Sequence, residues 1–501
     1  MKYFFSFLGI LTLLLALSQC QPDPHAEGKR LAGVYCGNCH LVPAPTDLTR
    51  EIWLTEVLPL MGAFYGIYEG KTRQSYLKND AEAAYIGQVY PLSPRLDSLE
   101  WTAIKDYFLD GAADVLELAE PSSTLLTMDQ FKVHPVVGPA GASNRPLTTL
   151  IATNPVKNEI IAGGQLGNQG IVHHYSFDHQ HLRSAPTISP PVAYNDQLQS
   201  ILEIGSLVPS DLPLGRLRSI ADSTGIQTLR DSLRRPLDVI VIDLDLDGQS
   251  ETIVAEYGNM TGRLRAYPAQ GPPYNLTETP GAIRLRASDL NNDGKEDLIV
   301  LFAQGDERID VFFASKDGAK RQNLLRFPPS YGSSDLELAD YDGDGDSDLI
   351  YTNGDNYDYQ PIPKPYHGIR VFENNGRNEF SEAWFYPMDG AYGVEADDFD
   401  GDGDIDLAAI AYFIPPVKRS IYSFVYLEQQ SKKKFQPFGF EKSSGQHFIC
   451  MTKADTDQDG DQDLLIGNFS NYLPDGGASG YGKKGVSPLY LWLENQGEKT
   501  N

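Results

Sequence analysis

An acidic pattern of nine residues recurs five times in this chain of 501 residues, and no other feature constrains the fold as strongly. Carboxylates or amides stand at positions 1, 3 and 5, glycine at position 6, and an acid at position 9. The five copies begin at Asp243, Asp289, Asp340, Asp398 and Asp455, so successive copies start 46 to 58 residues apart. This regular spacing indicates a repeat architecture with one structural unit per copy.

The residues that follow each copy distinguish the pattern from an EF-hand, which shares its first six positions. An EF-hand needs glutamate at position 12 and a helix after the loop. Position 12 here is occupied by Val254, Val300, Tyr351, Ala409 or Ile466, and each copy precedes a short β-type run. The loops are therefore expected to join two strands. Three or four short strands per unit at this spacing predict a β-propeller.

The pattern also predicts calcium. Positions 1, 3, 5 and 9 direct oxygen ligands toward one point, glycine at position 6 allows a sharp turn, and a backbone carbonyl at position 7 can join them. Hard oxygen ligands in this number favour Ca²⁺ over Mg²⁺. A solvated acidic turn is the alternative for a single copy, but five copies in phase favour calcium. The expected ligands are Asp243, Asp245, Asp247, Glu251, Asp289, Asn291, Asp293, Asp297, Asp340, Asp342, Asp344, Asp348, Asp398, Asp400, Asp402, Asp406, Asp455, Asp457, Asp459 and Asp463.

Residues 238–496 resemble the FG-GAP/VCBS repeat family, which includes the propellers of integrin α chains. The resemblance rests on the acidic loops and on segment 368–380, which is typical of a strand, a tight turn and a second strand. Segments 147–190 and 196–236 look like two further units without the acidic loop, so seven blades are expected. The last unit ends one strand short, which would leave an open edge. Residues 129–135 are the expected donor of the missing outer strand.

A second motif, Cys36-Gly-Asn-Cys39-His40, is the attachment pattern of c-type haem. One helical turn carries the two sulfurs to the two haem vinyl groups, and the adjacent His40 then supplies an imidazole nitrogen to the iron. A thioredoxin-like redox pair would need a βαβ context, and a zinc site would need a second Cys or His pair nearby. A disulfide is the remaining alternative. The motif favours covalently bound haem c.

Residues 26–112 around this motif resemble a small all-α cytochrome c. Helices are expected from Glu27 to Tyr35, from Thr49 to Pro59 and from Leu96 to Leu109, and the third should pack against the first. The third helix carries four apolar or aromatic residues on or near one face: Leu99, Ile104, Tyr107 and Phe108.

The sixth ligand of the iron is expected to be Met61. A thioether is a common ligand on that side of the haem, and no histidine lies between His40 and His134. The alternatives are His25, an open position, or a methionine that only fills the core.

Residues 1–20 are typical of an export signal, because a basic residue precedes an apolar run that is too short to span a membrane. Cys20 resembles the lipidated first residue of bacterial lipoproteins. Gln19 departs from the small residue usual before that cysteine, so ordinary cleavage after Ser18 is the alternative. The expected organisation is a signal peptide over 1–20, a haem domain over 21–121 and a propeller over 122–501, anchored by lipid in the bacterial envelope.

The formal net charge of −27 argues against binding to nucleic acid or to an anionic lipid surface. Three long loops, 354–366, 412–419 and 471–484, are expected on the face opposite the acidic loops. They combine tyrosine, proline and lysine, which is typical of a surface that binds a protein or a glycan, and solvated loops without a partner are the alternative. His173 and His174 should point to opposite faces of a strand, which disfavours a second metal site there.

Three functions are compatible with these features. The first is an envelope electron-transfer protein, in which the propeller holds a redox partner or a substrate. The second is a propeller enzyme that oxidises a substrate and passes electrons to the fused haem, although no dinucleotide-binding or nucleophile motif is present. The third is an adhesion or glycan-binding module with accessory haem. We favour electron transfer, which needs no proton-transfer or nucleophilic residue.

Overall fold

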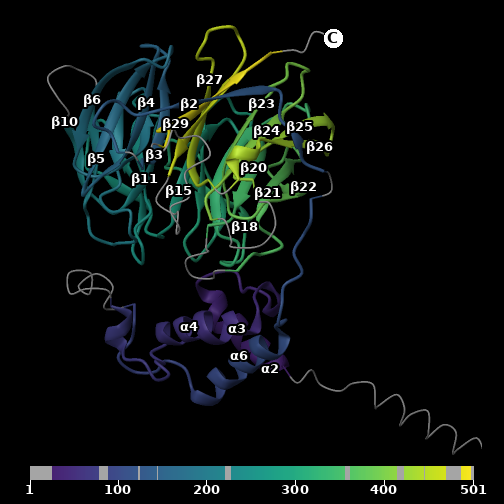
Figure 1. The fold of residues 1–501 in the computed structure, drawn as a ribbon. Helices are drawn as coiled ribbons and strands as arrows, with labels where there is room; N and C mark the ends of the chain where they lie inside the picture. Colours follow the sequence, from purple (N-terminus) through teal and green to yellow (C-terminus); the bar gives the residue numbers. More distant parts are fainter. Residues whose placement is uncertain are drawn as a thin grey trace, which may run out of the picture.

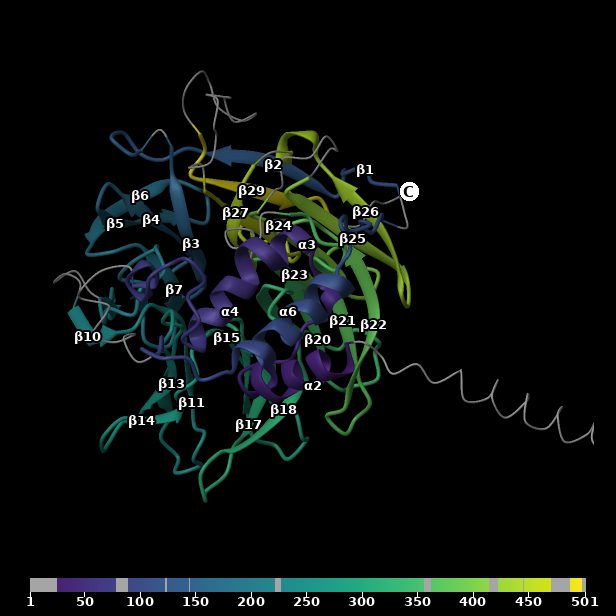
Figure 2. The ribbon, with the colours of Figure 1, turned by 90° about the horizontal axis from the view of Figure 1, so that it is seen from below.

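The computed structural model describes residues 25–77, 89–121, 124–143, 145–220, 227–355, 362–413, 422–444, 446–469 and 487–497. Within these ranges a helical module comes first, and a ring of seven β-sheets follows (Figure 1). The helices gather beneath one end of the ring, and the view from below shows them lying across the sheets (Figure 2). The expected seven-bladed propeller is confirmed.

Each blade is a sheet of four or five strands, and all strand pairs but one are antiparallel. The blades comprise β3 (Leu147–Asn154), β4 (Glu159–Leu166), β5 (Gln169–Ser176) and β6 (His181–Thr187); β7 (Pro191–Asn195), β8 (Ser200–Glu203), β9 (Gly215–Ser219) and β10 (Gln227–Leu233); β11 (Pro236–Ile242), β12 (Glu251–Glu256), β13 (Arg263–Tyr267) and β14 (Tyr274–Thr277); β15 (Ala282–Ser288), β16 (Asp297–Phe302), β17 (Arg308–Phe313) and β18 (Lys320–Arg326); β19 (Ser333–Ala339), β20 (Asp348–Asn353), β21 (Gly368–Asn374) and β22 (Phe380–Pro387); β23 (Ala391–Asp397), β24 (Asp406–Ala411), β25 (Phe424–Ser431), β26 (Lys434–Gly439) and β1 (Leu126–Thr127); and β27 (Phe448–Ala454), β28 (Asp463–Asn468), β29 (Tyr490–Asn495) and β2 (Phe131–Val136).

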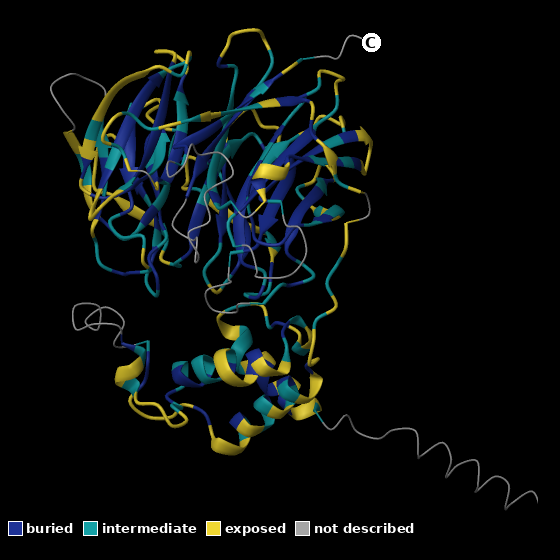
Figure 3. Cartoon of the chain, in the orientation of Figure 1, coloured by how far each residue is buried: buried dark blue, intermediate teal, exposed yellow. Residues whose placement is uncertain are grey.

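The core lies between neighbouring blades. All six residues are buried in β16, in β20, in β24 and in β28, the second strands of four blades (Figure 3). A strand that is covered on both faces carries mostly apolar residues, so each of these strands appears in the sequence as a short apolar run without alternation that follows a buried Asp.

The ring closes through a strand from before the first blade. β2 pairs antiparallel with β29 over six residues, from Phe131 opposite Asn495 to Val136 opposite Tyr490. The predicted closure of the last blade is therefore confirmed, and the edge of β29 is covered. A second contact was not predicted: β1 adds to the outer edge of β26 as a parallel pair.

The helical module contains α2 (Ala26–Tyr35), α3 (Arg50–Ile52), a π-helical turn (Trp53–Val57), α4 (Leu58–Phe64) and α6 (Ser98–Gly111), with 3-10 turns at Cys36–Asn38, Pro45–Asp47 and Arg73–Tyr76. One further 3-10 turn, Glu441–Ser443, lies in the propeller. α2 crosses α6 at Gly28, where an added Cβ would meet the Ala103 carbonyl oxygen at 2.2 Å. The predicted packing of the last helix on the first is confirmed.

Two details of the helices differ from the prediction. The second helical stretch does not end at Pro59, because the π-helical turn Trp53–Val57 runs directly into α4 and Pro59 falls in the first turn of α4. Leu99 does not face the core and is 79% exposed. The buried face of α6 carries Trp101, Ile104 and Phe108 instead.

Among the residues that the structure describes, no helix has the length and apolarity needed to cross a membrane. The expected export signal and Cys20 lie outside the described residues.

Candidate functional site

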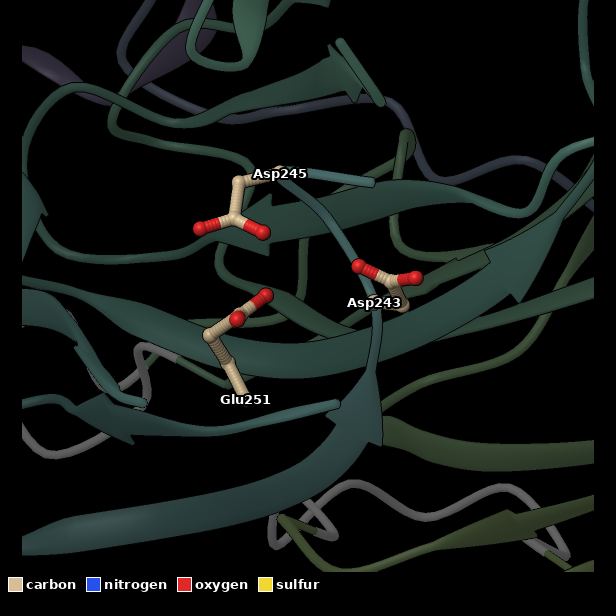
Figure 4. Close-up of side chains that lie close together, drawn as sticks. All are labelled: Asp243, Asp245 and Glu251. Carbon is tan, nitrogen blue, oxygen red and sulfur yellow. The ribbon is translucent and has the colours of Figure 1, made fainter. Parts of the chain in front are cut away.

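The five acidic loops lie at one end of the propeller, and each joins the first strand of a blade to the second, as predicted. In four loops, carboxylate oxygens lie within 4.8 Å of one another. The first of these clusters contains Asp243, Asp245 and Glu251, whose carboxylates point toward a common centre (Figure 4). The other three are Asp340, Asp342 and Asp344; Asp398, Asp400 and Asp402; and Asp455, Asp457 and Asp459.

The backbone explains why glycine stands at position 6. Its φ angle is positive in all five loops, between 81° and 104°, a range that side chains rarely adopt. The amide of this glycine donates to the aspartate at position 1, for example from Gly248 to Asp243 Oδ2 over 3.0 Å. The same bond occurs in the other four loops. It bends each loop back on itself, and positions 1, 3 and 5 meet in the clusters of the third, fourth and fifth loops.

The acid at position 9 is almost fully buried in every loop. It ties the loop to the rest of the blade: Asp348 accepts the amide of Tyr341 within its loop at 2.9 Å and that of Asn374 at the end of β21 at 2.7 Å. Among the described residues, Glu251 is the position-9 acid that also belongs to one of the four carboxylate clusters. For Asp297, Asp348, Asp406 and Asp463, a role as metal ligand stays a prediction.

Four carboxylate oxygens in the last two loops are buried without a hydrogen-bond partner among the described residues: Oδ1 of Asp398, Asp404, Asp455 and Asp461. Asp404 and Asp461 occupy position 7, where the sequence analysis expected only a backbone carbonyl. Burial and the neighbouring carboxylates raise the pKa of Asp461 to about 7 and that of Asp404 to about 6. These side chains were overlooked, although an acid at position 7 is visible in three of the five copies.

The cysteine motif directly follows α2. Cys36 and Cys39 stand at the two ends of one 3-10 turn, in which the Cys39 amide donates to the Cys36 carbonyl over 3.2 Å, and both thiols are free. His40 Nδ1 donates to the Leu41 carbonyl oxygen over 2.9 Å, which leaves the lone pair on Nε2. Burial lowers the pKa of His40, so the imidazole is neutral at neutral pH. The motif thus presents two thiols and one imidazole lone pair.

Met61 lies in α4 and is half-buried. It packs against the core of the helical module, which contains Trp53 and Trp101, and Cys36 borders the same core. Tyr65 lies beside the cysteines: its hydroxyl donates to the Tyr35 carbonyl oxygen over 2.6 Å, and its pKa is raised to about 12 by burial and, to a smaller extent, by both thiols. The structure therefore places Met61 and Cys36 at the same apolar core.

The helical module contacts the propeller face opposite the acidic loops. Tyr366, just before β21, donates its hydroxyl to the Asp47 carbonyl oxygen over 2.8 Å, and its ring stacks on Tyr331 at 4.9 Å between centroids. Ile362 from the same loop packs against the helical core. Loop 354–366 was expected to form a surface for a partner. In the structure, part of this loop contacts the chain's own helical module.

A second contact to the module comes from the loop between β12 and β13. The buried carboxylate of Asp211 accepts the amides of Asn259, Met260 and Thr261, each over about 3 Å, and so fixes the loop. Met260 packs against the cluster formed around Tyr90 in the helical module. Nothing in the sequence indicated this contact, because it depends on how the two parts of the chain meet.

A charged cluster lies on the same face, at the blade that contains β17 and β18. Asp306 is bridged by Arg308 and Arg326, each at 2.6 Å. Burial has the largest effect on the pKa of His40 and lowers it. Asp306 and Arg326 have smaller and opposite effects: Asp306 raises this pKa and Arg326 lowers it. His40 therefore lies within electrostatic reach of this cluster.

The remaining predicted features have simpler roles. His173 shares a hydrogen bond with Ser184 at 2.7 Å, whereas His174 pairs with Glu159 at 3.0 Å, so the two imidazoles have separate partners. Large parts of the other two loops expected to bind a partner, 414–421 and 470–486, lie outside the described residues.

The fold and the loops define residues 126–495 as a seven-bladed β-propeller with acidic loops between first and second strands. A family model described as FG-GAP-like repeat matches residues 289–351 and 340–409, which hold the second, third and fourth acidic loops. This part of the chain consists of FG-GAP repeats. A comparison with curated protein sequences gives no match.

Solved structures that resemble the chain are distant in sequence. A protein from Lactobacillus plantarum is 11% identical, with a TM-score of 0.41, and the match covers 58% of this chain and 85% of that one. A putative 6-phosphogluconolactonase from Bacteroides fragilis is 11% identical with a TM-score of 0.41, covering 62% and 94% respectively. The WD40 domain of SCAP from fission yeast is 10% identical with a TM-score of 0.36, covering 73% and 98%.

Proposed function

We propose that the protein is an exported c-type haem electron-transfer protein whose calcium-binding propeller carries the haem module. The observation that carries this proposal is the geometry of the cysteine motif. Two free thiols stand one helical turn apart, and the next residue, His40, holds its imidazole through Nδ1 so that Nε2 faces away from the backbone. A metal-ligating histidine typically makes this bond from its second nitrogen.

The residues fit haem c in the following way. Cys36 and Cys39 would form the thioether links, His40 would be the proximal ligand and Met61 the distal one. Cys36 is half-buried beside the apolar core and Cys39 is exposed, so a group linked to both would have one side against the core and one side toward solvent. When bound, the haem supplies one-electron exchange between Fe(II) and Fe(III), and the protein holds the ligands and limits access of water.

An absorption spectrum and a haem stain on a denaturing gel test this proposal. The full chain is produced alongside c-type haem assembly machinery. We expect a covalently retained haem with a sharp reduced α band and a weak far-red band from sulfur–iron ligation, and we expect Met61→Ala to lose only the far-red band. The matched control is Met260→Ala, which removes a methionine on the propeller side of the module. Absence of covalent haem in the unmodified chain would refute the proposal.

Calcium binding by the acidic loops is the second part of the proposed function. It is supported by the four carboxylate clusters and by the buried, unpartnered oxygens of the last two loops, because buried carboxylates without a partner are costly and a divalent cation would satisfy them. Calcium would hold the loop ends of neighbouring strands together. A cation that binds only the folded state at a hundred times its Kd adds about 2.7 kcal/mol per site.

Calorimetric titration of chelator-treated protein with calcium tests this part. We expect several sites, a rise in Tm with calcium, and loss of one site in the double variant Asp398→Asn, Asp400→Asn. The control is Glu441→Gln, which removes an exposed carboxylate outside the loops. Equal stoichiometry in the double variant and the control would contradict the assignment.

The proposal also places the chain in the bacterial envelope, anchored by lipid on Cys20, where a redox protein exchanges electrons with the haem and a protein or glycan binds the propeller. The variant Cys20→Ser should then appear in the soluble fraction, whereas the unmodified chain stays with the membrane. Reduction of the haem by a substrate added to the purified protein alone would instead favour a propeller dehydrogenase. Tight glycan binding without redox change would favour adhesion.

A further inference from the structure

The cluster of Asp306, Arg308 and Arg326 lies on the propeller face that the helical module contacts. It contains one negative and two positive side chains. Arg308 is buried, with 2% of its surface exposed, and it also pairs with Asp310 at 2.8 Å. Arg326 ends β18 and pairs only with Asp306 among the described residues. Its guanidinium therefore adds a positive charge at the rim of the blade.

This rim lies on the propeller face that the helical module contacts, and α2, which directly precedes the cysteine motif, lies near β17 and β18 (Figures 1 and 2). The connections between second and third strands, and those between blades, lie on the face opposite the acidic loops, and Figures 1 and 2 show the helical module beneath that face near β17 and β18. The connection that follows Arg326 includes Tyr331, which stacks on Tyr366, and Tyr366 holds Asp47 of the helical module. Asp47 follows His40 by only seven residues. These contacts fix the helical module against the propeller face that carries the rim.

Charge near a redox centre changes its reduction potential, because one-electron reduction lowers the net charge at the iron by one unit. A nearby cation therefore favours the reduced state, and a nearby anion favours the oxidised state. In a protein of effective dielectric constant about 20, one unit charge at roughly 10 Å from the iron changes the ratio of reduced to oxidised haem by roughly tenfold. Partial exposure of the charged side chain to solvent reduces this effect.

We propose that Asp306 and Arg326 of the propeller set the reduction potential of the haem held by His40, so that the propeller acts as a tuning element for the electron carrier. The inference rests on the proposed haem function. Asp306 and Arg326 act through space on the iron site and touch neither substrate nor haem ligand. Their role in this proposal is to set the electrostatic potential at the iron.

Potentiometric titration of the full, haem-loaded chain tests this inference with two variants of opposite sign. Arg326→Gln removes a positive charge and should lower the midpoint potential. Asp306→Asn removes a negative charge and should raise it. At the midpoint of the unmodified protein, the ferrous-to-ferric ratio should change by roughly threefold to tenfold in each case, in opposite directions.

Two further variants separate charge from structure. Arg326→Lys keeps the charge and should keep the potential. Lys320→Gln removes the same charge from the other end of β18, roughly 20 Å away along the strand, where salt screens the interaction, and it should leave the potential unchanged. A structural role for the cluster would not produce shifts of opposite sign.

Different results would overturn the potential-tuning role and the proposed haem function. Covalent haem with potentials that do not move, or that move in the same direction in both variants, would overturn this inference and leave the electron-transfer function intact. A chain that takes up no covalent haem would overturn both.

Discussion

Ring closure by β2 provides the sharpest test of the fold, through the single substitution Phe131→Ala. Phe131 is 3% exposed and lies in the core between the last two blades, with its ring 5.6 Å from that of Phe399 and 5.3 Å from that of Tyr426, both in edge-on arrangement. Removal of a buried phenylalanine side chain typically costs about 3–5 kcal/mol. Each aromatic pair adds about 0.5–1.5 kcal/mol, and the loss of two such pairs places the cost toward the upper end of that range.

The expected change in Tm follows from the size of the propeller. Residues 126–495 form a unit of 370 residues. At about 2.1 cal/mol/K per residue, its entropy of unfolding near Tm is roughly 0.8 kcal/mol/K. A loss of about 4 kcal/mol therefore lowers Tm by about 5 °C. Thermal unfolding followed by circular dichroism, at fixed calcium, measures this shift, and faster proteolysis between the helical module and β2 should accompany it.

Lys132→Ala is the matched control on the same strand. Its side chain is 61% exposed and reaches Glu494 at 3.4 Å, an exposed ion pair worth at most about 1 kcal/mol. Tm should fall by about 1 °C or less. If Phe131→Ala were no less stable than Lys132→Ala, the paired strand would not contribute to closure, and the argument from the open edge would be wrong.

Three further predictions concern the core, the module contact and pH. Gly28→Ala should destabilise the helical module by about 1–3 kcal/mol in urea unfolding, because its Cβ would clash with α6, whereas Gly33→Ala, with no atom within 4 Å of the new Cβ, should be neutral or stabilising. Tyr366→Phe removes the bond to Asp47 and should weaken the contact between module and propeller by about 1 kcal/mol, seen as faster hydrogen exchange in residues 44–47; unchanged exchange would contradict the contact. Burial lowers the pKa of His173 and of His179 from 6.5 to about 4, so the folded protein keeps both neutral while the unfolded chain takes up protons. Stability should therefore be lost as pH falls from about 6.5 toward 4, by at most about 3 kcal/mol per residue, and His179→Gln should flatten the pH profile of the unfolding free energy.

The sequence predicted most of the propeller, because its acidic loops recur at the blade period and each precedes a continuous apolar strand. The closing strand was also predictable, since the last unit lacked a strand and residues 129–135 had the matching pattern. The parallel pairing of β1 with β26 involves two residues, too few to show a periodic pattern.

In the helical module, the spacing of apolar residues and prolines led to two wrong predictions. Leu99 matches the apolar face of its helix in spacing, but it lies in the first turn after the N-cap residue Asp97, and the core does not extend to it. Pro59 was expected to end a helix, although the π-helical turn before it places proline at the start of α4. The contacts of Met260 and Tyr366 with the module depend on tertiary packing, for which a single sequence carries no signal.

The pairing of β2 with β29 joins residues 354 to 364 positions apart, in the first and last long strands of the ring. During synthesis at about 5–20 residues per second, β2 would wait roughly 20 to 70 s before its partner exists. The helical module precedes β2 in the chain, so it can fold while the ring is still open. Completion of the last blade then requires that β29 has been synthesised, and a chain that stops before β29 keeps an unpaired β2 edge that proteases and chaperones can recognise. The closing strand therefore serves as a check on chain length as well as a structural element.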